Sequence, residues 1–415
     1  MFMINETKNR KTNIVLLLFT IVCFLQLSGL KGIANYISAG LMAVIGLFAL
    51  YMTEWKIHIE TALVFLFIVF YVLTSIPQIN ITYCITYSIN YFLMLSPAMM
   101  LPVFNQMIEK DVGVSERRIL KVLFAVWFLM VVISIVFYLQ NPSAARVLAA
   151  DGDAYAGTLI GGYPLSYGSG LLCVALFGFN LKYEHKKKMK SLLWCCSIIL
   201  FALVYLTEST LTTFATIVGI IVVLITNTKS SGKNKTIYYM ILIGVIVMGA
   251  MIVYSTIEKN ITVIISWLNS KNDVLIYRRI REILNSVFLD VQSRHYSERT
   301  GLVSESLKLF AESPVIGHGY KYGNVFSAGK AYGIGNHSEF FDCLAKFGIM
   351  GSLPLFSLYF GSLRNIAKYN LGVIASFTMM VLFNPFITFA SSLTIFVIIP
   401  LLYQMGNRNY VNDYN

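Results

Sequence analysis

Three side chains that could take part in a group-transfer reaction lie close together in the second half of this 415-residue chain. Arg299 carries a guanidinium, which stays charged at any working pH and binds phosphate oxygens through a planar fork of donors. His337 can serve as a base, an acid or a hydrogen-bond donor near neutral pH. Glu339 is a second candidate base. Together they predict a site that could bind phosphate oxygens and exchange a proton with a bound molecule.

Further arginines and glycines flank these three side chains. The arginines add cationic density that suits a phosphate or a lipid headgroup, and the glycines allow a close approach of backbone to ligand. Each arginine taken alone fits a loop-surface or lipid-headgroup contact better than a substrate site, and Asn336 or Ser338 could cap the helix that follows. The candidate substrate-binding residues are Arg278, Arg281, Arg294, Gly317, Gly319 and Asn336.

The composition is that of an integral membrane protein. Hydrophobic residues make up 57% of the chain and charged residues 13%, about half of the roughly 25% found in soluble domains. Apolar runs of about 20 residues recur along its length. We therefore predict an all-α polytopic membrane protein with about twelve transmembrane helices. The predicted spans are 14–30, 33–53, 59–76, 81–103, 119–140, 162–181, 191–207, 208–226, 237–257, 347–362, 370–386 and 388–405.

The basic residues predict the orientation of these spans. Alternate short connections hold 19 Lys and Arg on one side and two on the other, so the rich side and both termini are expected in the cytoplasm. The net charge of +12 has the same origin, and no basic patch with interleaved aromatics suggests nucleic acid. We divide the chain into 1–257 with nine spans, 258–346 as one large extracytoplasmic loop that carries the site, and 347–415 with three spans and a cytoplasmic tail.

The large loop contains helical and irregular parts. An apolar stripe at helical spacing predicts a helix over 271–290, and a second helix is expected over 297–314, ending before Pro314. The glycine-rich stretch 315–335 is expected to be irregular, with a helix resuming after His337. The six cysteines have no metal-ligand spacing, and no Walker motif or nucleophile elbow is present, so we expect neither a metal nor a cofactor.

The order of these elements resembles the O-antigen ligase and O-antigen polymerase superfamily of bacterial envelope glycosyltransferases. The resemblance is carried by an arginine in a helix, a proline-containing turn to G-x-G, and a histidine before a helix with G-x-x-G. Two departures distinguish the chain from typical ligases: Ser338 follows the histidine in place of asparagine, and a middle span ends in ESTL without a Ser-Arg pair. The matching residues are Arg299, Pro314, Gly317–His318–Gly319, His337 and Gly348–Ile349–Met350–Gly351.

The resemblance implies a metal-independent glycosyltransferase in the bacterial cytoplasmic membrane, with its active site on the outer face. It would be a repeat-unit polymerase that moves a growing glycan from undecaprenyl pyrophosphate to a sugar hydroxyl of the next lipid-linked unit. Its products would be lipopolysaccharide O-antigen, capsule or another polymer, and a flippase and a chain-length regulator are the implied partners. The alternatives are an O-antigen ligase that acts on lipid A-core, a polysaccharide flippase or other secondary transporter, and a non-catalytic scaffold.

The topology yields a direct test. In Asp290→Cys, a membrane-impermeant thiol reagent added to intact cells should label the new cysteine, because 258–346 is expected outside. The matched variant Ser230→Cys, in a predicted inner connection, should be labelled only after the inner face is exposed. The opposite pattern would contradict the orientation.

Overall fold

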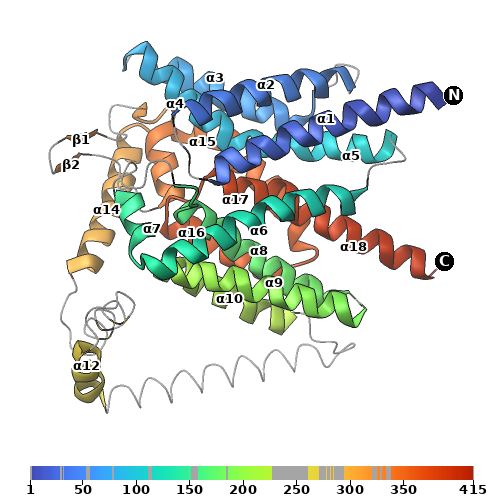
Figure 1. The fold of residues 1–415 in the computed structure, drawn as a ribbon. Helices are drawn as coiled ribbons and strands as arrows, with labels where there is room; N and C mark the ends of the chain where they lie inside the picture. Colours follow the sequence, from blue (N-terminus) through green and yellow to red (C-terminus); the bar gives the residue numbers. More distant parts are fainter. Residues whose placement is uncertain are drawn as a thin grey trace, which may run out of the picture.

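The computed structural model describes residues 2–28, 30, 32–52, 57–76, 79–110, 115–150, 158–183, 186–226, 260–270, 277, 281, 284, 294–319, 325–327, 330–332 and 338–414. The described chain is a helical bundle with one two-stranded hairpin (Figure 1). Its elements are α1 Phe2–Leu27, α2 Ile33–Met52, α3 Ile59–Ser75, α4 Ile81–Leu95, η1 Ser96–Met99, α5 Met100–Lys110, α6 Glu116–Gln140, α7 Ala144–Ala150, α8 Tyr163–Lys182, α9 Lys187–Leu206, α10 Thr210–Thr226, α12 Ile261–Ser270, α14 Arg294–Glu312, β1 Val325–Ser327, β2 Lys330–Tyr332, α15 Glu339–Ala367, α16 Leu371–Phe383, α17 Phe389–Leu393, η3 Thr394–Ile398 and α18 Ile399–Tyr414.

Apolar helices coincide with eleven of the twelve predicted spans, and the ninth span, 237–257, lies outside the described residues. Among the residues that the structure describes, six helices are long and apolar enough to cross a membrane, and shorter apolar helices of 10–17 residues accompany them. The total of twelve crossings stays a prediction. The six are Ile81–Glu109, Glu116–Gln140, Tyr163–Lys182, Lys187–Leu206, Glu339–Ala367 and Phe389–Arg408.

Polar N-cap residues fix where several of these helices begin. A side-chain oxygen of Asn80, Ser115, Ser338 or Asn370 accepts a hydrogen bond from a backbone N–H in the first turn. At α17, Thr388 and Ser391 form a reciprocal capping box. Such caps satisfy N–H groups that an apolar environment would otherwise leave unpaired, so they place each helix start to within a residue.

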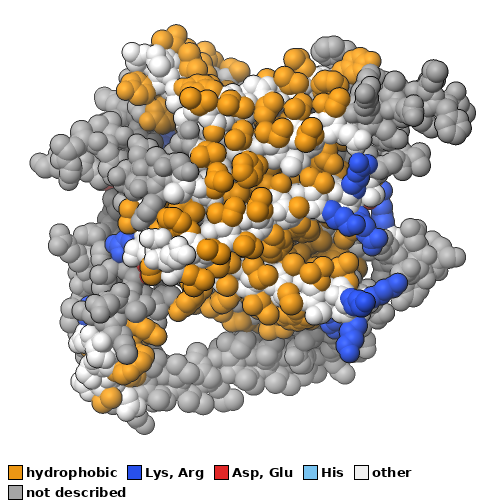
Figure 2. All heavy atoms as spheres, viewed as in Figure 1, with side chains coloured by type: hydrophobic (Ala, Val, Ile, Leu, Met, Phe, Trp, Pro, Cys, Tyr) orange, Lys and Arg blue, Asp and Glu red, His pale blue; other side chains and the backbone are white. Residues whose placement is uncertain are grey.

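The outer surface of the bundle is apolar between two polar ends. On α6, for example, Leu129, Val132 and Val136 are exposed, while Trp127 and Met130 on the opposite face are buried. A helix that is apolar on both faces belongs in lipid or in a large core. Figure 2 shows this apolar surface, and Lys and Arg side chains gather at the end of the molecule where both termini lie.

Close helix crossings and buried hydrogen bonds hold the interior together. Gly219 of α10 and Gly372 of α16 face each other, and a Cβ on Gly372 would lie 2.2 Å from the Gly219 carbonyl oxygen. Such small residues let helix backbones approach one another, which is typical of membrane helices. Near the termini, the Asn370 amide donates to the Tyr403 hydroxyl at 2.9 Å. An ion pair between Arg408 and the buried Glu116, 2.9 Å apart, ties α18 to the start of α6.

The last apolar helix contains a π-helical turn. Residues 394–398 form η3 between α17 and α18, and all five of them are buried. The wider turn lies against α15, where the Ser362 hydroxyl donates to the Ile395 carbonyl at 2.8 Å. Tyr359, three residues earlier on α15, shares a 2.8 Å hydrogen bond with Ser392. α15 and the α17–η3–α18 helix are thus joined by hydrogen bonds in their middle sections.

The large loop differs from expectation in one respect. The second predicted helix, 297–314, is present as α14, but the stretch expected to be irregular contains the antiparallel hairpin of β1 and β2. Ser327 pairs with Lys330 at the inner end of this hairpin. α12, α14 and the hairpin lie at the end of the bundle opposite the termini (Figure 1). Most of the predicted helix 271–290 lies outside the described residues.

Candidate functional site

The backbone of the turn after α14 contacts the backbone of α15 directly, within the first half of α15. The turn that follows α14 runs alongside a kink in α15 at Gly348, where φ is 57° and ψ is −165°. The N–H of Ile349 donates to the Pro314 carbonyl at 2.9 Å, and the N–H of Met350 donates to the Val315 carbonyl at 3.0 Å. The proline turn and the G-x-x-G segment, which are separate motifs in the sequence, are therefore one structural unit.

Glycine is required at both crossing points of this unit. Gly317 and Gly348 have φ values of +69° and +57°, in the region that favours glycine. A Cβ on Gly317 would lie 2.4 Å from the Lys346 carbonyl oxygen, and a Cβ on Gly348 would lie 2.4 Å from the Val315 carbonyl oxygen. Gly319, also at positive φ, follows directly. A substrate-binding role for Gly317 and Gly319 stays a prediction. The close backbone contact is by itself enough to explain why position 317 is a glycine.

His318, between these two glycines, is engaged within the loop. Its backbone N–H donates to the Ala345 carbonyl at 3.0 Å. Its Nε2 lies 2.8 Å from the Leu309 carbonyl oxygen and 3.7 Å from a carboxylate oxygen of Glu312. The imidazole therefore joins the end of α14 to the turn. Its contacts indicate a positioning role.

A buried carboxylate links α14 to the N-terminus of α15. Asp342 is 4% exposed, and its Oδ1 accepts a 2.7 Å hydrogen bond from the hydroxyl of Ser306, which is fully buried. Its Oδ2 accepts from the Ser338 N–H at 3.3 Å. A buried carboxylate with two donors resists separation, because each group would lose its partner in an apolar setting. We call Ser306, Asp342 and Ser338 the carboxylate link.

The carboxylate link connects the helix of Arg299 to the residue beside His337. Arg299 lies seven residues before Ser306 in α14, which is nearly two full helical turns. The two positions are about 10 Å apart along the helix axis at 1.5 Å per residue. His337 lies outside the described residues, but it directly precedes Ser338. The described backbone therefore brings α14 against Ser338, the residue that follows His337 in the sequence.

The side chain of Glu339 is hydrogen-bonded to other parts of the fold. Its Oε2 accepts hydrogen bonds from the backbone N–H groups of Phe386 at 2.7 Å and Ile387 at 2.9 Å. The Cys343 thiol donates to Oε1 at 3.3 Å, and the Glu339 N–H donates to the Asn384 carbonyl at 3.1 Å. These bonds attach the start of α15 to the loop between α16 and α17. A general base needs a free lone pair directed at substrate, so these contacts favour a positioning role for Glu339.

The remaining predicted residues are placed only in part. Arg294 opens α14, and Arg299 lies in its second turn. The Arg281 guanidinium donates to the Asn269 side chain in α12. Arg278, Asn336 and His337 lie outside the described residues. The structure thus places Gly317, Gly319, Glu339 and the backbone of Arg299 on α14, on α15 and on the turn after α14, and the site roles of the whole predicted set stay predictions.

Aromatic and strained residues also lie at this end of the bundle. Phe386, whose N–H binds Glu339, packs on Tyr167 of α8 with ring centroids 6.0 Å apart. Glu208, in the turn between α9 and α10, has a φ of 55°, a left-handed conformation that is uncommon outside glycine. Such outliers persist where the surrounding structure holds them, and they cluster at functional sites.

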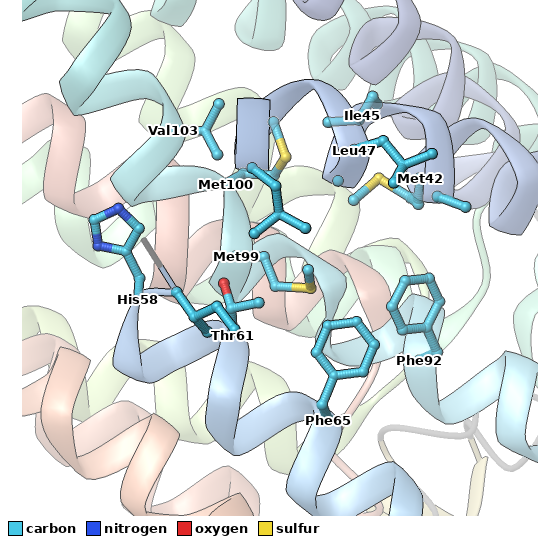
Figure 3. Close-up of a pocket in the computed structure, with 14 residues that line it drawn as sticks. Met42, Ile45, Leu47, His58, Thr61, Phe65, Phe92, Met99, Met100 and Val103 are labelled. Carbon is cyan, nitrogen blue, oxygen red and sulfur yellow. The ribbon is translucent and has the colours of Figure 1, made fainter. Parts of the chain in front are cut away.

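Two cavities lie elsewhere in the molecule. One, of about 340 Å³, is almost entirely apolar and is bounded by α2, α3 and the α4–α5 region (Figure 3). Met42, Phe65 and Met99 extend into it, and His58 lies at its edge. The other, of about 560 Å³, is bounded by α3, α5, α15 and α18. Both cavities lie in the half of the bundle nearer the termini, so neither coincides with the carboxylate link.

Part of the chain, including this region, matches a known protein family. Residues 195–356 match the family model described as O-Antigen ligase. The resemblance to the O-antigen ligase and polymerase superfamily is confirmed. The matched segment runs from α9 to the middle of α15 and contains Glu208, Arg299, the carboxylate link and the Gly348 kink. No curated protein matches the chain.

The superfamily match and the apolar helices together make the chain a membrane protein with an O-antigen ligase-like glycosyltransferase segment. In the described ranges, no three His, Cys, Asp or Glu side chains are grouped so that they could hold a metal ion. The sequence presents Asp342 only as a carboxylate on a first helical turn, and it gives no reason to single out Ser306. A serine in mid-helix gives no signal of its own, because its role depends on the register between α14 and α15.

The glycine crossing predicts a specific sensitivity. Gly348→Ala should lower thermal stability and abundance, because the new Cβ would overlap the Val315 carbonyl and the backbone would have to hold a strained φ. Melting of the detergent-solubilised protein, followed by size exclusion, measures the effect. Gly361→Ala is the matched control on the same helix, since a Cβ there meets nothing within 4 Å. Equal melting temperatures for the two variants would contradict the proposed crossing.

Proposed function

We propose that this protein is a repeat-unit polymerase. It would transfer the growing glycan from undecaprenyl pyrophosphate to a sugar hydroxyl of the next lipid-linked repeat unit. The observation that carries the proposal is the carboxylate link, which holds the helix of Arg299 against the residue next to His337. Both candidates fall within the segment that matches the O-antigen ligase family.

The proposed chemistry needs two groups on opposite sides of the reacting sugar. The bond between the anomeric carbon and the pyrophosphate oxygen breaks, and the leaving group gains negative charge that Arg299 stabilises through bidentate contact. His337 accepts the proton of the attacking hydroxyl as the new glycosidic bond forms. Arg281 and Arg294 would add positive potential for the lipid-linked pyrophosphate. No metal is required by this scheme.

The proposed setting follows from the distribution of charge. The Lys and Arg side chains at the end near the termini favour a cytoplasmic location for that end (Figure 2). The carboxylate link would then lie on the outer face of the bacterial cytoplasmic membrane, where lipid-linked repeat units are polymerised. A flippase and a chain-length regulator are the expected partners.

A ligase that transfers the finished glycan to lipid A-core is the second candidate, because the matched family is described by that activity. Deletion of the gene separates the two functions. Loss of a polymerase leaves single lipid-linked repeat units, whereas loss of a ligase leaves long polymer on the lipid carrier. Extraction of the lipid-linked glycans and sizing by gel or mass spectrometry distinguishes them. Long carrier-bound polymer in the deletion strain would exclude the polymerase.

His337 is expected to be the base. His337→Ala should reduce transfer by about 10²–10⁴-fold while abundance is retained, the usual range for loss of general acid–base catalysis. Cells should accumulate single lipid-linked units. Glu339→Gln is the paired variant, and it should act chiefly by loosening the loop between α16 and α17, with a lower melting temperature. Normal polymer in His337→Ala together with none in the stable Glu339→Gln protein would assign the base to Glu339.

Asp342 is expected to act through Arg299. Asp342→Ala removes the acceptor for Ser306 and for the Ser338 N–H, so α14 should shift relative to His337 and transfer should fall. Arg299→Lys should also reduce transfer, since an ammonium does not reproduce bidentate contact. If Asp342 positions Arg299, the loss in the double variant is smaller than the product of the single losses.

Glu305→Ala is the control for this cycle, because Glu305 is an exposed α14 residue one position from Ser306. It should leave transfer unchanged. Fully multiplicative losses for Asp342→Ala and Arg299→Lys, with both proteins at normal abundance, would separate Asp342 from the site.

A further inference from the structure

The larger cavity lies at the end of the bundle opposite the carboxylate link. Its volume of about 560 Å³ falls within the roughly 300–1,000 Å³ typical of ligand sites, and we call it the terminal crevice. It is bounded by α3, η1, α5, α15, η3 and α18, which come from the stretches 59–102 and 357–404 of the sequence. Gly361 lines it from α15, and a Cβ at this position would meet nothing within 4 Å.

The walls of the terminal crevice change from apolar to polar along the bundle axis. On α15, Leu358 lies deep and Lys368 lies ten residues later at the helix end, a rise of about 15 Å at 1.5 Å per residue. That rise is close to half of the roughly 30 Å hydrocarbon core, or one leaflet. On α3, Glu60 lies at the helix start and Leu63 deeper.

The same order holds on the last apolar helix, where Phe396 of η3 lies deep and Gln404 of α18 lies nearer the terminal end. On each of these three helices a charged or amide side chain lies nearer the terminal end than an apolar one, while Ser357 also lines the deep level and Ile59 and Ile366 also line the mouth. This gradient matches a molecule with a polar head and an apolar tail that lies along the bundle. A phospholipid of one leaflet has this shape and this polarity.

Two opposite charges at the mouth of the terminal crevice specify the headgroup. Glu60 is half-buried, and neither ion pair between described side chains involves it. The Lys368 ammonium is exposed and donates to the Asn365 side chain at 3.4 Å, which leaves it further donors. A lipid phosphate suits Lys368, and a carboxylate beside it suits a cationic amine. An anionic lipid without an amine would be repelled by Glu60.

We propose that the terminal crevice binds one zwitterionic, amine-bearing phospholipid of the phosphatidylethanolamine class. Its phosphate contacts Lys368, its amine contacts Glu60, and an acyl chain packs along Leu63 and Leu358. The proposal does not rest on the transferase function, since the terminal crevice lies at the other end of the bundle. The apolar cavity in Figure 3 carries no comparable charge pair that would specify an occupant.

Native mass spectrometry of the delipidated full-length protein tests the proposal. Phosphatidylethanolamine and phosphatidylglycerol with identical acyl chains are titrated separately. Wild-type protein should retain one phosphatidylethanolamine with at least about tenfold higher affinity than phosphatidylglycerol, a difference of about 1.4 kcal/mol. Gly361→Trp should fill the crevice and lower that affinity by about tenfold or more.

Matched variants test the contacts to the lipid headgroup and to the acyl chain separately. Gly40→Trp on α2 is the control, since a Cβ on Gly40 would also meet nothing within 4 Å and Gly40 lies outside the crevice. It should bind as wild type. Glu60→Gln should remove the preference for phosphatidylethanolamine without loss of fold, and Lys368→Gln should weaken both lipids. Equal binding of the two lipids by wild type, or wild-type binding by Gly361→Trp, would overturn the proposal.

Discussion

The arrangement of the candidate site depends on direct contact between two stretches of backbone. Where Gly317 and Gly348 meet, no side chain separates the loop after α14 from α15, and carbonyl oxygens of each segment lie where a Cβ would otherwise be. The kink at Gly348 frees the N–H groups of Ile349 and Met350 to bind the loop. The large polar segment is therefore attached to the membrane helices by main-chain hydrogen bonds, which depend little on side-chain identity.

The kink at Gly348 divides α15 into two parts that contact different elements. The part before Gly348 contains Glu339 and Asp342, whose carboxylates bind the α16–α17 loop and α14. The part after Gly348 packs within the bundle, where Tyr359 and Ser362 bind the last apolar helix. The predicted boundary between 346 and 347 falls beside this kink, although the three-part division of the chain is itself untested. Within the part of the chain that the structure describes, movement of the large segment would thus reach the bundle along α15 and, through Glu339, at the α16–α17 loop.

Hydropathy and capping residues were sufficient to predict most of the helices. Long apolar runs and polar caps such as Ser338 depend on local sequence, so eleven predicted spans and the start of α15 could be located. The hairpin of β1 and β2 was missed because six glycines between 315 and 335 masked a short alternating segment. The carboxylate link could not be predicted, because the pairing of Ser306 with Asp342 depends on how two helices align in space. The same applies to Glu339, whose backbone partners come from a loop 47 and 48 residues away.

The π-helical turn at 394–398 has a consequence for how this chain is compared with its relatives. Bonding from residue i to i+5 accommodates one residue more than a regular α-helical turn does. A related helix that is regular at this depth would reach the level of Ser362 and Tyr359 with one residue fewer. An alignment without a gap would then place every side chain of α18 about 100° out of phase with its true counterpart. A single-residue gap within 394–398 restores the correspondence between Tyr403, Gln404 and Arg408 and their equivalents.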